Sequence, residues 1–590
     1  MGDGRRTTGG GPAGRSRVVD YIVDHLVEIG VGHIFGVDGA NIEDLYDAAF
    51  FNTAITAVLA KHEFSAATMA DGYSRSGAGL GVVCATSGGG CLNTVPGLAE
   101  SLASRVPVLA LIGQPPMSLD GCGAFQDTSG LNGALNAEAL FTAVSVFCQR
   151  IVDPRDIVRA LPEAIAAART GGPAVLLLPK SIQQDTLADI AEGHHRPTAT
   201  SQAQTAIGDP QPIAAALRRT LGQITIIAGE QVARDDARIE LERLRAMLRA
   251  RVATVPDAKD VAGISGMGSS SALGVAGVMG HPGVATALAD SGLCLLLGTR
   301  LTVTARAGLE TALASVPVFS IGSAPPYVPC SHIHTDDLGV SLRLLIQALS
   351  GNGRATHVRV PDLVPRAELQ PPAHDGPGLR YRDTMRMLDA ALPPGVDIVV
   401  DAGNVGASAI HYLPVRRDGR FMVALGHGGM GYSFGAGIGM AFSRRRRTVV
   451  IAGDGAFYMH GMEIHTALQY RLPVTFLLFD NQAHAMCVTR EQLFYNDLYS
   501  YNRFGPSRLG AGLAAMFPEL AAVHVEDIDE LPGALQAALD VRGPSVISIK
   551  CSADEIPPFA AFLGRPASQS SSTEDHSTNK EGHSNVVART

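Results

Sequence analysis

The sequence lacks the segments that would place a chain in a membrane or send it through a secretory route. Its 590 residues contain no run of about 18 apolar residues. The first 17 residues, MGDGRRTTGGGPAGRSR, contain no apolar core. We therefore expect neither a membrane span nor a signal peptide.

Metal-binding and disulfide patterns are also missing. The eight cysteines, which run from Cys84 to Cys551, include no C-x-x-C pair, so the sequence predicts neither a zinc site nor a disulfide framework. This cysteine usage indicates a reducing, cytoplasmic setting. The formal net charge is -9, and the only cluster of one sign is the four arginines at 444–447. These arginines are typical of a solvated turn, and the charge pattern does not indicate a nucleic-acid partner.

Short apolar strands alternate with segments of helical period from residue 18 onward, as at HIFGV (33–37), GVVCAT (81–86) and AVLLLP (174–179). Strands that are apolar on both faces and separated by helices predict parallel sheets covered on both sides. We expect three doubly wound α/β domains. The predicted boundaries are a disordered N-terminus at 1–15, domains at 16–185, 213–350 and 379–552, linkers at 186–212 and 351–378, and a largely disordered tail at 553–590.

Two polar residues follow consecutive apolar runs of the third predicted domain. Asp454 lies inside Gly-Asp-Gly at 453–455, and Asn481 ends the next apolar run, one strand-helix-strand crossover later. Parallel strands place both side chains at the carboxyl edge of the sheet, where open α/β sheets bind ligands. A carboxylate, an amide and a nearby main-chain carbonyl suit Mg²⁺ whose coordination a diphosphate completes. The alternative is that Asp454 caps a helix and Asn481 lies in a turn.

This spacing resembles the thiamine-diphosphate signature of the acetolactate synthase and benzoylformate decarboxylase superfamily. The resemblance implies that Asp454, Asn481 and the main-chain carbonyl of Ala483 hold Mg²⁺. Asp480 stands where that family usually has the first residue of an Asn-Asn pair, and the ligand itself, Asn481, is kept. The resemblance also names the three domains as pyrimidine-binding, central and diphosphate-binding. The implied cofactor contacts are Gly403, Asn404, Gly428, Met430, Gly453, Asp454, Gly455, Ala456, Asn481 and Met486.

A competing motif lies in the same domain. GHGGMG at 426–431 matches the G-x-G-x-x-G dinucleotide fingerprint, follows a strand and precedes a helical segment. It would favour a flavin- or NAD-dependent oxidoreductase. The match is a weak one, because the acid after the next strand is Asp454 inside Gly-Asp-Gly, a setting that suits metal and diphosphate. In the thiamine enzymes the corresponding residue, here Met430, supports the bent cofactor; the alternative is an ordinary core methionine.

Thiamine chemistry needs a carboxyl group that protonates the aminopyrimidine ring. The segment KHEFSAATMADGYSR at 61–75 resembles the family segment R-H-E-x-A-A-x-x-A-D-G-Y-A-R, with Glu63 as the activating glutamate. We expect this carboxyl to be buried, which would raise its pKa. The alternative is an exposed glutamate at a helix N-terminus, stabilised by the helix dipole. In this family Glu63 and Asp454 come from different subunits, so the resemblance implies a homodimer or tetramer.

Other matches suggest the branch of the family. Asp38 and Gly89 stand where the family has proline, in FGVDG and TSGGG, while GCGAFQD at 121–127 resembles the A-F-Q-E of acetolactate synthases, in which Phe125 and Gln126 would line the site. This favours decarboxylation of a 2-keto acid, with pyruvate as the expected donor, and ligation of the resulting enamine to a second carbonyl. The alternatives are a non-ligating decarboxylase of the benzoylformate decarboxylase type and a silent paralogue, which the presence of Glu63 and Asp454 disfavours.

Departures from the family limit these inferences. Ala485 replaces the usual glycine before Met486, and His484 is either an acid-base group above the cofactor or a histidine in ordinary packing. The segment GTRLTVTARAG at 298–308 lacks the G-x-R-F-D-D-R pattern that accompanies flavin. We therefore expect no bound FAD, and no regulatory subunit.

Overall fold

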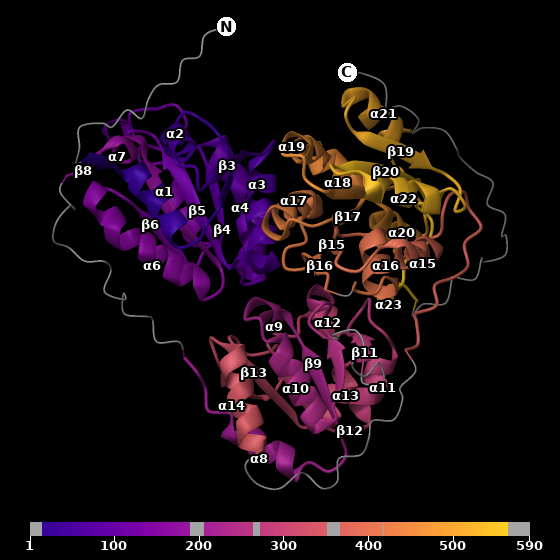
Figure 1. Ribbon diagram of the computed structural model, residues 1–590. Helices are drawn as coiled ribbons and strands as arrows, with labels where there is room; N and C mark the ends of the chain where they lie inside the picture. Colours follow the sequence, from indigo (N-terminus) through magenta and orange to yellow (C-terminus); the bar gives the residue numbers. More distant parts are fainter. Residues whose placement is uncertain (1–14, 189–205, 263–271, 351–365, 417, 564–590) are drawn as a thin grey trace, which may run out of the picture.

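The computed structural model describes residues 15–188, 206–262, 272–350, 366–416 and 418–563. These residues form three α/β units, each built on a six-stranded sheet with helices against its faces (Figure 1). Every strand pairing within the six-stranded sheets is parallel. The predicted fold class, three doubly wound parallel-sheet domains, is therefore confirmed.

The first unit has the strand order β3-β2-β4-β5-β7-β6. Its central strands are buried along their whole length, because helices cover both faces of the sheet. The strands are β2 (His33–Val37), β3 (Thr56–Leu59), β4 (Gly81–Ala85), β5 (Val108–Gln114), β6 (Phe147–Arg150) and β7 (Pro173–Pro179). The helices are α1 (Val18–Glu28), α2 (Glu43–Phe51), α3 (Glu63–Tyr73), α4 (Gly89–Ala103), α5 (Ala137–Thr142), α6 (Ile157–Arg169) and α7 (Lys180–Gln184).

The central unit has the strand order β11-β10-β9-β12-β13-β14. In Figure 1 it lies below the other two units. Its strands are β9 (Gln223–Ala228), β10 (Arg251–Thr254), β11 (Ala272–Val275), β12 (Ser291–Leu297), β13 (Val318–Gly322) and β14 (Ser331–His334). Its helices are α8 (Gln211–Arg219), α9 (Glu230–Arg234), α10 (Arg238–Leu248), α11 (Gly283–Ala289), α12 (Val303–Arg306), α13 (Glu310–Ser315) and α14 (Leu338–Ser350).

The third unit has the strand order β16-β15-β17-β18-β20-β19. Its strands are β15 (Asp397–Val400), β16 (Phe421–Val423), β17 (Thr448–Gly453), β18 (Val474–Asp480), β19 (Ala521–Val525) and β20 (Ser545–Lys550). Its helices are α15 (Tyr381–Ala391), α16 (Asn404–Tyr412), α17 (Tyr432–Arg444), α18 (Asp454–His460), α19 (Ile464–Gln469), α20 (Ala485–Phe494), α21 (Leu509–Met516), α22 (Leu531–Asp540) and α23 (Ala560–Leu563). The chain reverses its direction of strand addition between β15 and β17, which makes their carboxyl ends the switch point of the sheet.

Some observed elements lie inside segments predicted as linkers or ends. The predicted linker at 186–212 contains β8 (Thr186–Ala188), which pairs antiparallel with β1 (Arg15–Arg17), and the first residues of α8. Helix α23 lies within the segment predicted as the tail. Residues 1–14, 189–205, 351–365 and 564–590, on which much of the disorder and linker predictions rest, lie outside the described residues.

Helices α3 and α17 pack tightly together and join the first and third units. Helix α3 is buried on all sides after Glu63, so it has no solvent face. Small residues allow the close approach: a side chain on Gly72 would collide with the backbone of Ala436, and one on Gly439 with the backbone of Met69. Tyr432 also donates a hydrogen bond from its hydroxyl to Asp71, across the joint. The glycines of YSFGAGIG thus serve helix packing.

The central unit contacts the third unit through a buried lysine. Lys259 donates hydrogen bonds from Nζ to the carbonyl oxygens of Ala409, Ile410 and Leu413, at the end of α16. The ammonium group thereby caps the end of the helix, where the last carbonyl groups lack the regular i+4 donor; only that of Ala409 also accepts from a backbone group, Leu413 N. Within the described chain, no helix combines the length and the apolar character that crossing a bilayer requires.

Candidate active site at two sheet edges

The switch point of the third sheet brings the predicted cofactor residues together. Gly403 and Asn404 follow β15, Gly453 ends β17 and Asp454 follows it, and Asn481 follows β18, the neighbour of β17. The register pairs Gly453 with Phe479, so the next residues leave the sheet side by side. The prediction from crossover length therefore holds for the positions of Asp454 and Asn481.

Asp454 is fully buried, and a backbone N–H group donates to each of its side-chain oxygens. Its Oδ1 accepts from Gly455 N at 2.8 Å, and its Oδ2 accepts from Gln482 N at 2.5 Å. Burial, together with the neighbouring charge of Asp480, raises the pKa of Asp454 to about 7. A buried carboxylate beside a second acid lacks a cation, which a metal ion would supply.

The loop that carries Asn481 and Ala483 is held in a fixed shape. Asn481 Oδ1 accepts from Ala483 N at 3.0 Å, and its Nδ2 donates to Tyr381 Oη at 3.3 Å. Gln482, between them, has a φ of +56°, a left-handed conformation unusual for a residue with a side chain. Residues 502–504 pair with this turn: Phe504 N donates to Gln482 O at 2.6 Å, and His484 N donates to Asn502 O at 2.8 Å.

The residues present fit a diphosphate and a divalent cation. A side chain added at Gly403, Gly428 or Gly453 would meet no atom within 4 Å, so the backbone is open to a ligand at the ends of three neighbouring strands. Asn404 is buried, and its Oδ1 has no hydrogen-bond partner among the described residues. Asn404 also begins α16, whose N-terminus attracts anions. The described residues contain no group of three or more His, Cys, Asp or Glu placed to hold a metal ion, so amide, carbonyl and phosphate oxygens would have to complete the coordination of a metal held by Asp454.

The loop at 426–431 is anchored by two carboxylates that the sequence reasoning missed. Glu100, from α4 of the first unit, accepts hydrogen bonds from His427 N at 2.6 Å and from Gly426 N and Gly428 N at 3.3 Å. Asp401, at the end of β15, accepts from Gly431 N at 3.1 Å. Asp401 could have been found by the rule that found Asp454, since it also follows a buried strand. The residues around Glu100 in the sequence give no indication that it anchors this loop.

The hydrogen bonds that anchor the loop at 426–431 disfavour a dinucleotide site at GHGGMG. In a dinucleotide fingerprint, the glycine-rich loop and the following helix N-terminus hold the pyrophosphate. Here the N–H groups of Gly426, His427 and Gly428 are bonded to the carboxylate of Glu100, so they are not free to hold a pyrophosphate as a dinucleotide fingerprint does. Met430, the predicted cofactor support, is half-buried and packs against the core formed by the first and third units. The geometry therefore suits a cofactor support better than a dinucleotide site.

The first unit gathers a second group of predicted residues. Glu63 is the first residue of α3; its Oε2 accepts from Asn93 Nδ2 at 2.9 Å, and a side chain on Gly90 would lie 3.1 Å from its Oε1. Gln126 has a φ of +61°, and its Oε1 accepts from Thr86 Oγ1 at 3.4 Å. Glu63 is only half-buried in a single chain, so the burial expected of the activating acid is not seen within one chain.

The residues gathered around Glu63 in the first unit lie near those at the switch point of the third sheet in the same chain. Glu63 and Asp454 themselves are not in direct contact. Phe64 lies against the glycine-rich loop, because a side chain on Gly429 would be 3.2 Å from its ring. No hydrogen bond or ion pair in the described chain joins Glu63 to Asp454. Phe125 keeps 80% of its surface exposed, so it forms no closed pocket with Gln126 in the single chain.

His484 and Met486 lie at the start of α20. The His484 ring covers the Gly-Asp-Gly turn: a side chain on Gly455 would be 2.6 Å from His484 Cδ2 and 3.0 Å from its Nε2. The ring of Phe504 stands perpendicular to it, with centroids 4.8 Å apart. Met486 is half-buried and packs against the core of the third unit. His484 therefore lies beside the residues that would hold the diphosphate. Ala456 follows the same turn and is buried.

Comparison with known proteins agrees with this geometry. Residues 16–134 match the family described as "Thiamine pyrophosphate enzyme, N-terminal TPP binding domain", and residues 401–549 match its "C-terminal TPP binding domain". The two matches contain Glu63 and Gln126 on one side and Asp454 and Asn481 on the other.

Curated relatives cover nearly the whole chain. The "Probable acetolactate synthase large subunit" of Methanocaldococcus jannaschii is 28% identical over 572 residues, which are 92% of this chain and 94% of the relative. The acetolactate synthase isozyme 2 large subunit of Escherichia coli is 26% identical, over 91% of this chain and 95% of the relative. The chloroplastic acetolactate synthase 2 of Nicotiana tabacum is 26% identical, over 90% and 81%. With both binding domains present in one chain and the cofactor residues at the sheet edges, the chain belongs to the thiamine pyrophosphate enzymes.

Proposed function

We propose that the protein is a thiamine-diphosphate- and Mg²⁺-dependent enzyme that decarboxylates a 2-keto acid, with pyruvate as the donor, and ligates the product to a second carbonyl compound. The observation that carries the proposal is the switch point of the third sheet. There the buried carboxylate of Asp454 and the amide of Asn481 lie beside three glycines whose faces are open.

In this proposal each polar residue has a separate task. Asp454, Asn481 and the carbonyl of Ala483 would hold Mg²⁺, and Gly403, Gly428 and Gly453 would admit the diphosphate. Glu63 would exchange a proton with the aminopyrimidine nitrogen, and Met430 would support the ring system. When bound, thiamine diphosphate supplies a carbon nucleophile that adds to the keto carbonyl. His484 would give or take a proton, or a hydrogen bond, next to the diphosphate.

Carboligation is favoured over simple decarboxylation by two observations. The segment with Phe125 and Gln126 resembles the A-F-Q-E of acetolactate synthases, and Gln126 is held beside the glycine turn next to Glu63. The curated relatives quoted above are named acetolactate synthases. A decarboxylase of the benzoylformate decarboxylase type is the second candidate, and the identity of the product separates the two.

The proposal includes a homo-oligomer with a shared site. Glu63 is half-exposed and Phe125 is 80% exposed in one chain, whereas proton transfer to a bound ring requires an enclosed acid. The diphosphate-binding unit of a second copy would cover both. We further propose a cytoplasmic enzyme that works without FAD and without a regulatory subunit.

Cofactor binding is tested first by isothermal titration calorimetry, which does not need the tryptophan that this chain lacks. Thiamine diphosphate should bind in the presence of Mg²⁺ and not in the presence of EDTA. Asp454→Asn and Asn481→Ala should each weaken binding by at least about 100-fold. Asp540→Asn, an exposed acid of the same unit, is the matched control and should bind normally. Equal binding by Asp454→Asn and the wild type would exclude the proposed metal site.

Turnover is tested separately by mass spectrometry of the products from pyruvate and a panel of aldehydes and keto acids. Glu63→Gln should keep cofactor binding and lower the rate by about 100- to 10,000-fold. Glu138→Gln, also a glutamate in the first turn of a helix, is its control. An acetohydroxy acid or other hydroxyketone supports carboligation, whereas an aldehyde alone assigns the protein to the decarboxylases. Visible flavin absorbance in the purified protein would overturn the prediction about FAD.

A further inference from the structure

A buried carboxylate of the third unit holds the turn that precedes Glu63. Glu463 lies in the short turn of 3₁₀ helix that follows α18, and 1% of its surface is exposed. Its Oε1 accepts hydrogen bonds from Lys61 N at 2.8 Å and from His62 N at 3.1 Å. These two residues belong to the first unit and directly precede Glu63, the first residue of α3. A side chain of one unit therefore fixes the backbone that carries the proposed proton-handling acid of another.

No cation explains why an acid is buried at this position. Glu463 forms no ion pair within the described chain, and its Oε2 accepts from Thr466 Oγ1 at 2.7 Å. The ammonium group of Lys61 donates instead to Leu59 O and to Gln469 Oε1, both at 3.3 Å. Burial raises the pKa of Glu463, and hydrogen bonds from Thr466 and from the N–H of Lys61 oppose this rise. Because a carboxylate is costly to bury without donors, its contacts with these N–H groups are what an apolar residue could not replace.

A second side chain of the same segment packs against the start of α3. His460 is the last residue of α18, and its ring centroid lies 4.3 Å from that of Phe64. The ring of His62 stands at 72° to it, with centroids 5.0 Å apart. The segment at 460–463 thus contacts the chain on both sides of Glu63.

The side chain of Glu63 is held less firmly than its backbone. Asn93 Nδ2 donates to Glu63 Oε2 at 2.9 Å, and Asn93 is exposed on α4. An exposed amide can turn away when a ligand enters the site. The hydrogen bonds of Glu463 to the backbone are buried, so they are the ones that fix the start of α3.

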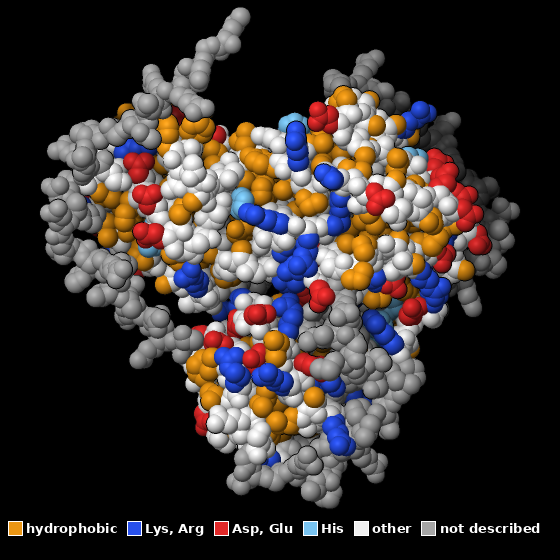
Figure 2. Space-filling view, in the orientation of Figure 1, with side chains coloured by type: hydrophobic (Ala, Val, Ile, Leu, Met, Phe, Trp, Pro, Cys, Tyr) orange, Lys and Arg blue, Asp and Glu red, His pale blue; other side chains and the backbone are white. Residues whose placement is uncertain are grey.

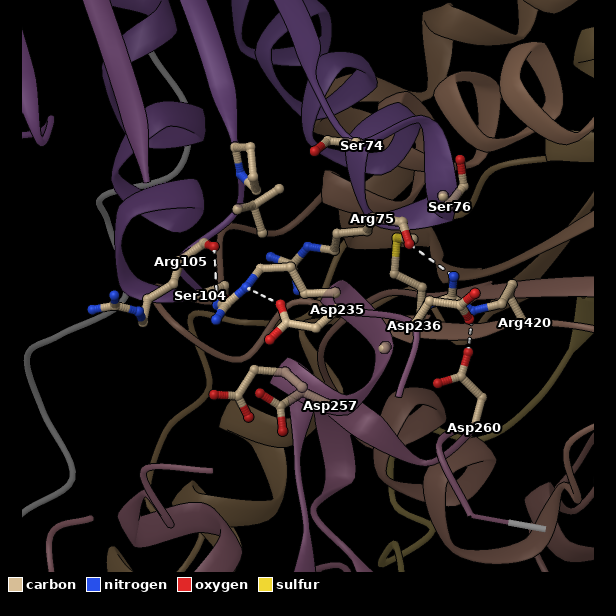
Figure 3. A pocket seen from close by; sticks show the side chains of 18 of the residues that line it. Ser74, Arg75, Ser76, Ser104, Arg105, Asp235, Asp236, Asp257, Asp260 and Arg420 are labelled. Carbon is tan, nitrogen blue, oxygen red and sulfur yellow. Dashed lines mark hydrogen bonds and ion pairs between the residues drawn. The ribbon is translucent and has the colours of Figure 1, made fainter. Parts of the chain in front are cut away.

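The far end of α3 is held independently. It lies at the junction with the central unit, where Figure 2 shows basic and acidic side chains close together. Arg420 of the third unit donates from Nη1 to Arg75 O at 2.8 Å, just beyond the end of α3, and forms an ion pair with Asp260 of the central unit (Figure 3). Loss of the contact at Glu463 would therefore release the first turn of α3 and leave its far end in place.

We propose that Glu463 is a positioning residue, which sets the place of the Glu63 carboxylate through the backbone of residues 61 and 62 and so sets the rate of proton transfer. The proposal rests on the function proposed above, which gives Glu63 its task. A displacement of about 1 Å can cost a catalytic group about 100-fold in rate. The role requires an acceptor at Oε1, which the amide oxygen of a glutamine also supplies. Glutamine should therefore replace Glu463, whereas methionine, which is similar in size and has no oxygen, should not.

The first test is the turnover assay described above, with kcat and KM measured separately. Glu463→Met should lower kcat by about 10- to 100-fold and leave KM and the dissociation constant of thiamine diphosphate within about 3-fold of the wild type. Glu463→Gln should keep kcat within about 3-fold. Glu242→Met, which removes a partly buried acid of α10 in the central unit, is the matched control and should keep the wild-type kcat. A wild-type kcat in Glu463→Met, or an equal fall in both Glu463 variants, overturns the proposal.

The second test separates positioning from a general loss of structure by a double-mutant cycle. If Glu463 acts through Glu63, the change Glu463→Met should lower kcat by less than about 2-fold in protein that already carries Glu63→Gln. A further loss as large as in the wild-type background would show that Glu463 acts on something else. If Glu463→Met does not fold, Glu463→Asp is used, because it withdraws the acceptor by one methylene group. It should lower kcat by at least about 5-fold, and an unchanged kcat overturns the proposal.

Hydrogen exchange tests the contact itself, without cofactor or substrate. The amides of Lys61 and His62 should exchange at least about 10-fold faster in Glu463→Met than in the wild type, while the amides in the last turn of α3 keep their rates. Unchanged rates at 61 and 62 overturn the proposal. Absence of any turnover by the wild-type protein refutes the proposed function instead, and the exchange rates then still decide whether Glu463 holds this turn.

Discussion

Glu100→Gln tests the anchoring of the cofactor loop with a change of almost no volume. Glu100 is 2% exposed, and both of its oxygens face only donors. Oε2 accepts from His427 N and Gly428 N, while Oε1 accepts from Ser104 Oγ, Arg75 Nη2 and Gly426 N. A glutamine must place its NH₂ group at one of these two positions, so a donor would face donors in either orientation.

The expected loss follows from these contacts. Hydrogen bonds to a charged group are worth about 1.5–3 kcal/mol each, and breaking a buried ion pair costs about 3–5 kcal/mol. Because Arg75 keeps Asp71 as a partner, we expect a local loss of about 3 kcal/mol. Although burial opposes it, Arg75 and the N–H of His427 lower the pKa of Glu100. The stability that Glu100 contributes is therefore present above its ordinary pKa of 4.5 and is lost as the pH falls through the lower folded value.

Hydrogen exchange of the amides at 426–428 is the direct assay. A loss of about 3 kcal/mol corresponds to exchange more than about 100-fold faster in the variant at neutral pH, if exchange proceeds through local opening. The affinity for thiamine diphosphate should also fall in Glu100→Gln, because Gly428 and Met430 lie in this loop. Glu163→Gln, which breaks an exposed i,i+4 ion pair with Arg159, should change neither. Wild-type exchange rates in Glu100→Gln would refute the anchoring role.

Three further changes test the packing. Lys259→Met removes the donor of the Ile410 and Leu413 carbonyl groups and one of the two donors of the Ala409 carbonyl, so denaturant unfolding should show a loss of about 3–5 kcal/mol; an unchanged midpoint would contradict this. Gly439→Val forces a side chain against the backbone of α3 and should lower the unfolding free energy by at least about 3 kcal/mol, whereas Gly533→Ala, in open space on α22, should not. Burial lowers the pKa of His411 from its ordinary 6.5 to about 4, so the folded state binds fewer protons than the unfolded state and stability falls as the pH drops from 6.5 to 4. His411→Gln should remove about 3 kcal/mol of that dependence, measured by denaturant unfolding at several pH values, and an equally steep dependence in the variant would show that another group is responsible.

The fold and half of the site follow from local sequence rules. Asp454 and Asn481 could be placed at one edge because a strand-helix-strand crossover between parallel strands returns the chain to that edge. Apolar strands with no polar alternation predicted sheets covered on both faces, and the buried strands of all three units show this. These inferences depend on residues close together in the chain.

The features that sequence reasoning missed depend on contacts between distant segments. Glu100 and His427 are in different units, and nothing near Glu100 indicates that its carboxylate would accept N–H groups from a loop of the third unit. Glu463 and Lys61 are 402 residues apart in the chain, and only the packing of the third unit against the first brings them together. The exposure of Glu63 was also beyond prediction, since it depends on what covers the first unit.

The joint between α3 and α17 has a mechanical consequence. Glu63 begins α3, and Met430 lies two residues before α17 begins, while Phe64 lies against Gly429 between them. The two helices touch backbone to backbone, so neither can slide without moving the residues at its own end. Glu63, proposed to handle a proton, and Met430, proposed to support the ring, are therefore fixed relative to each other in one chain, although in the shared-site oligomer proposed above they serve two different sites. Enlarging a small residue at this contact, such as Gly72 or Gly439, should displace both residues, so cofactor affinity and turnover should decline together.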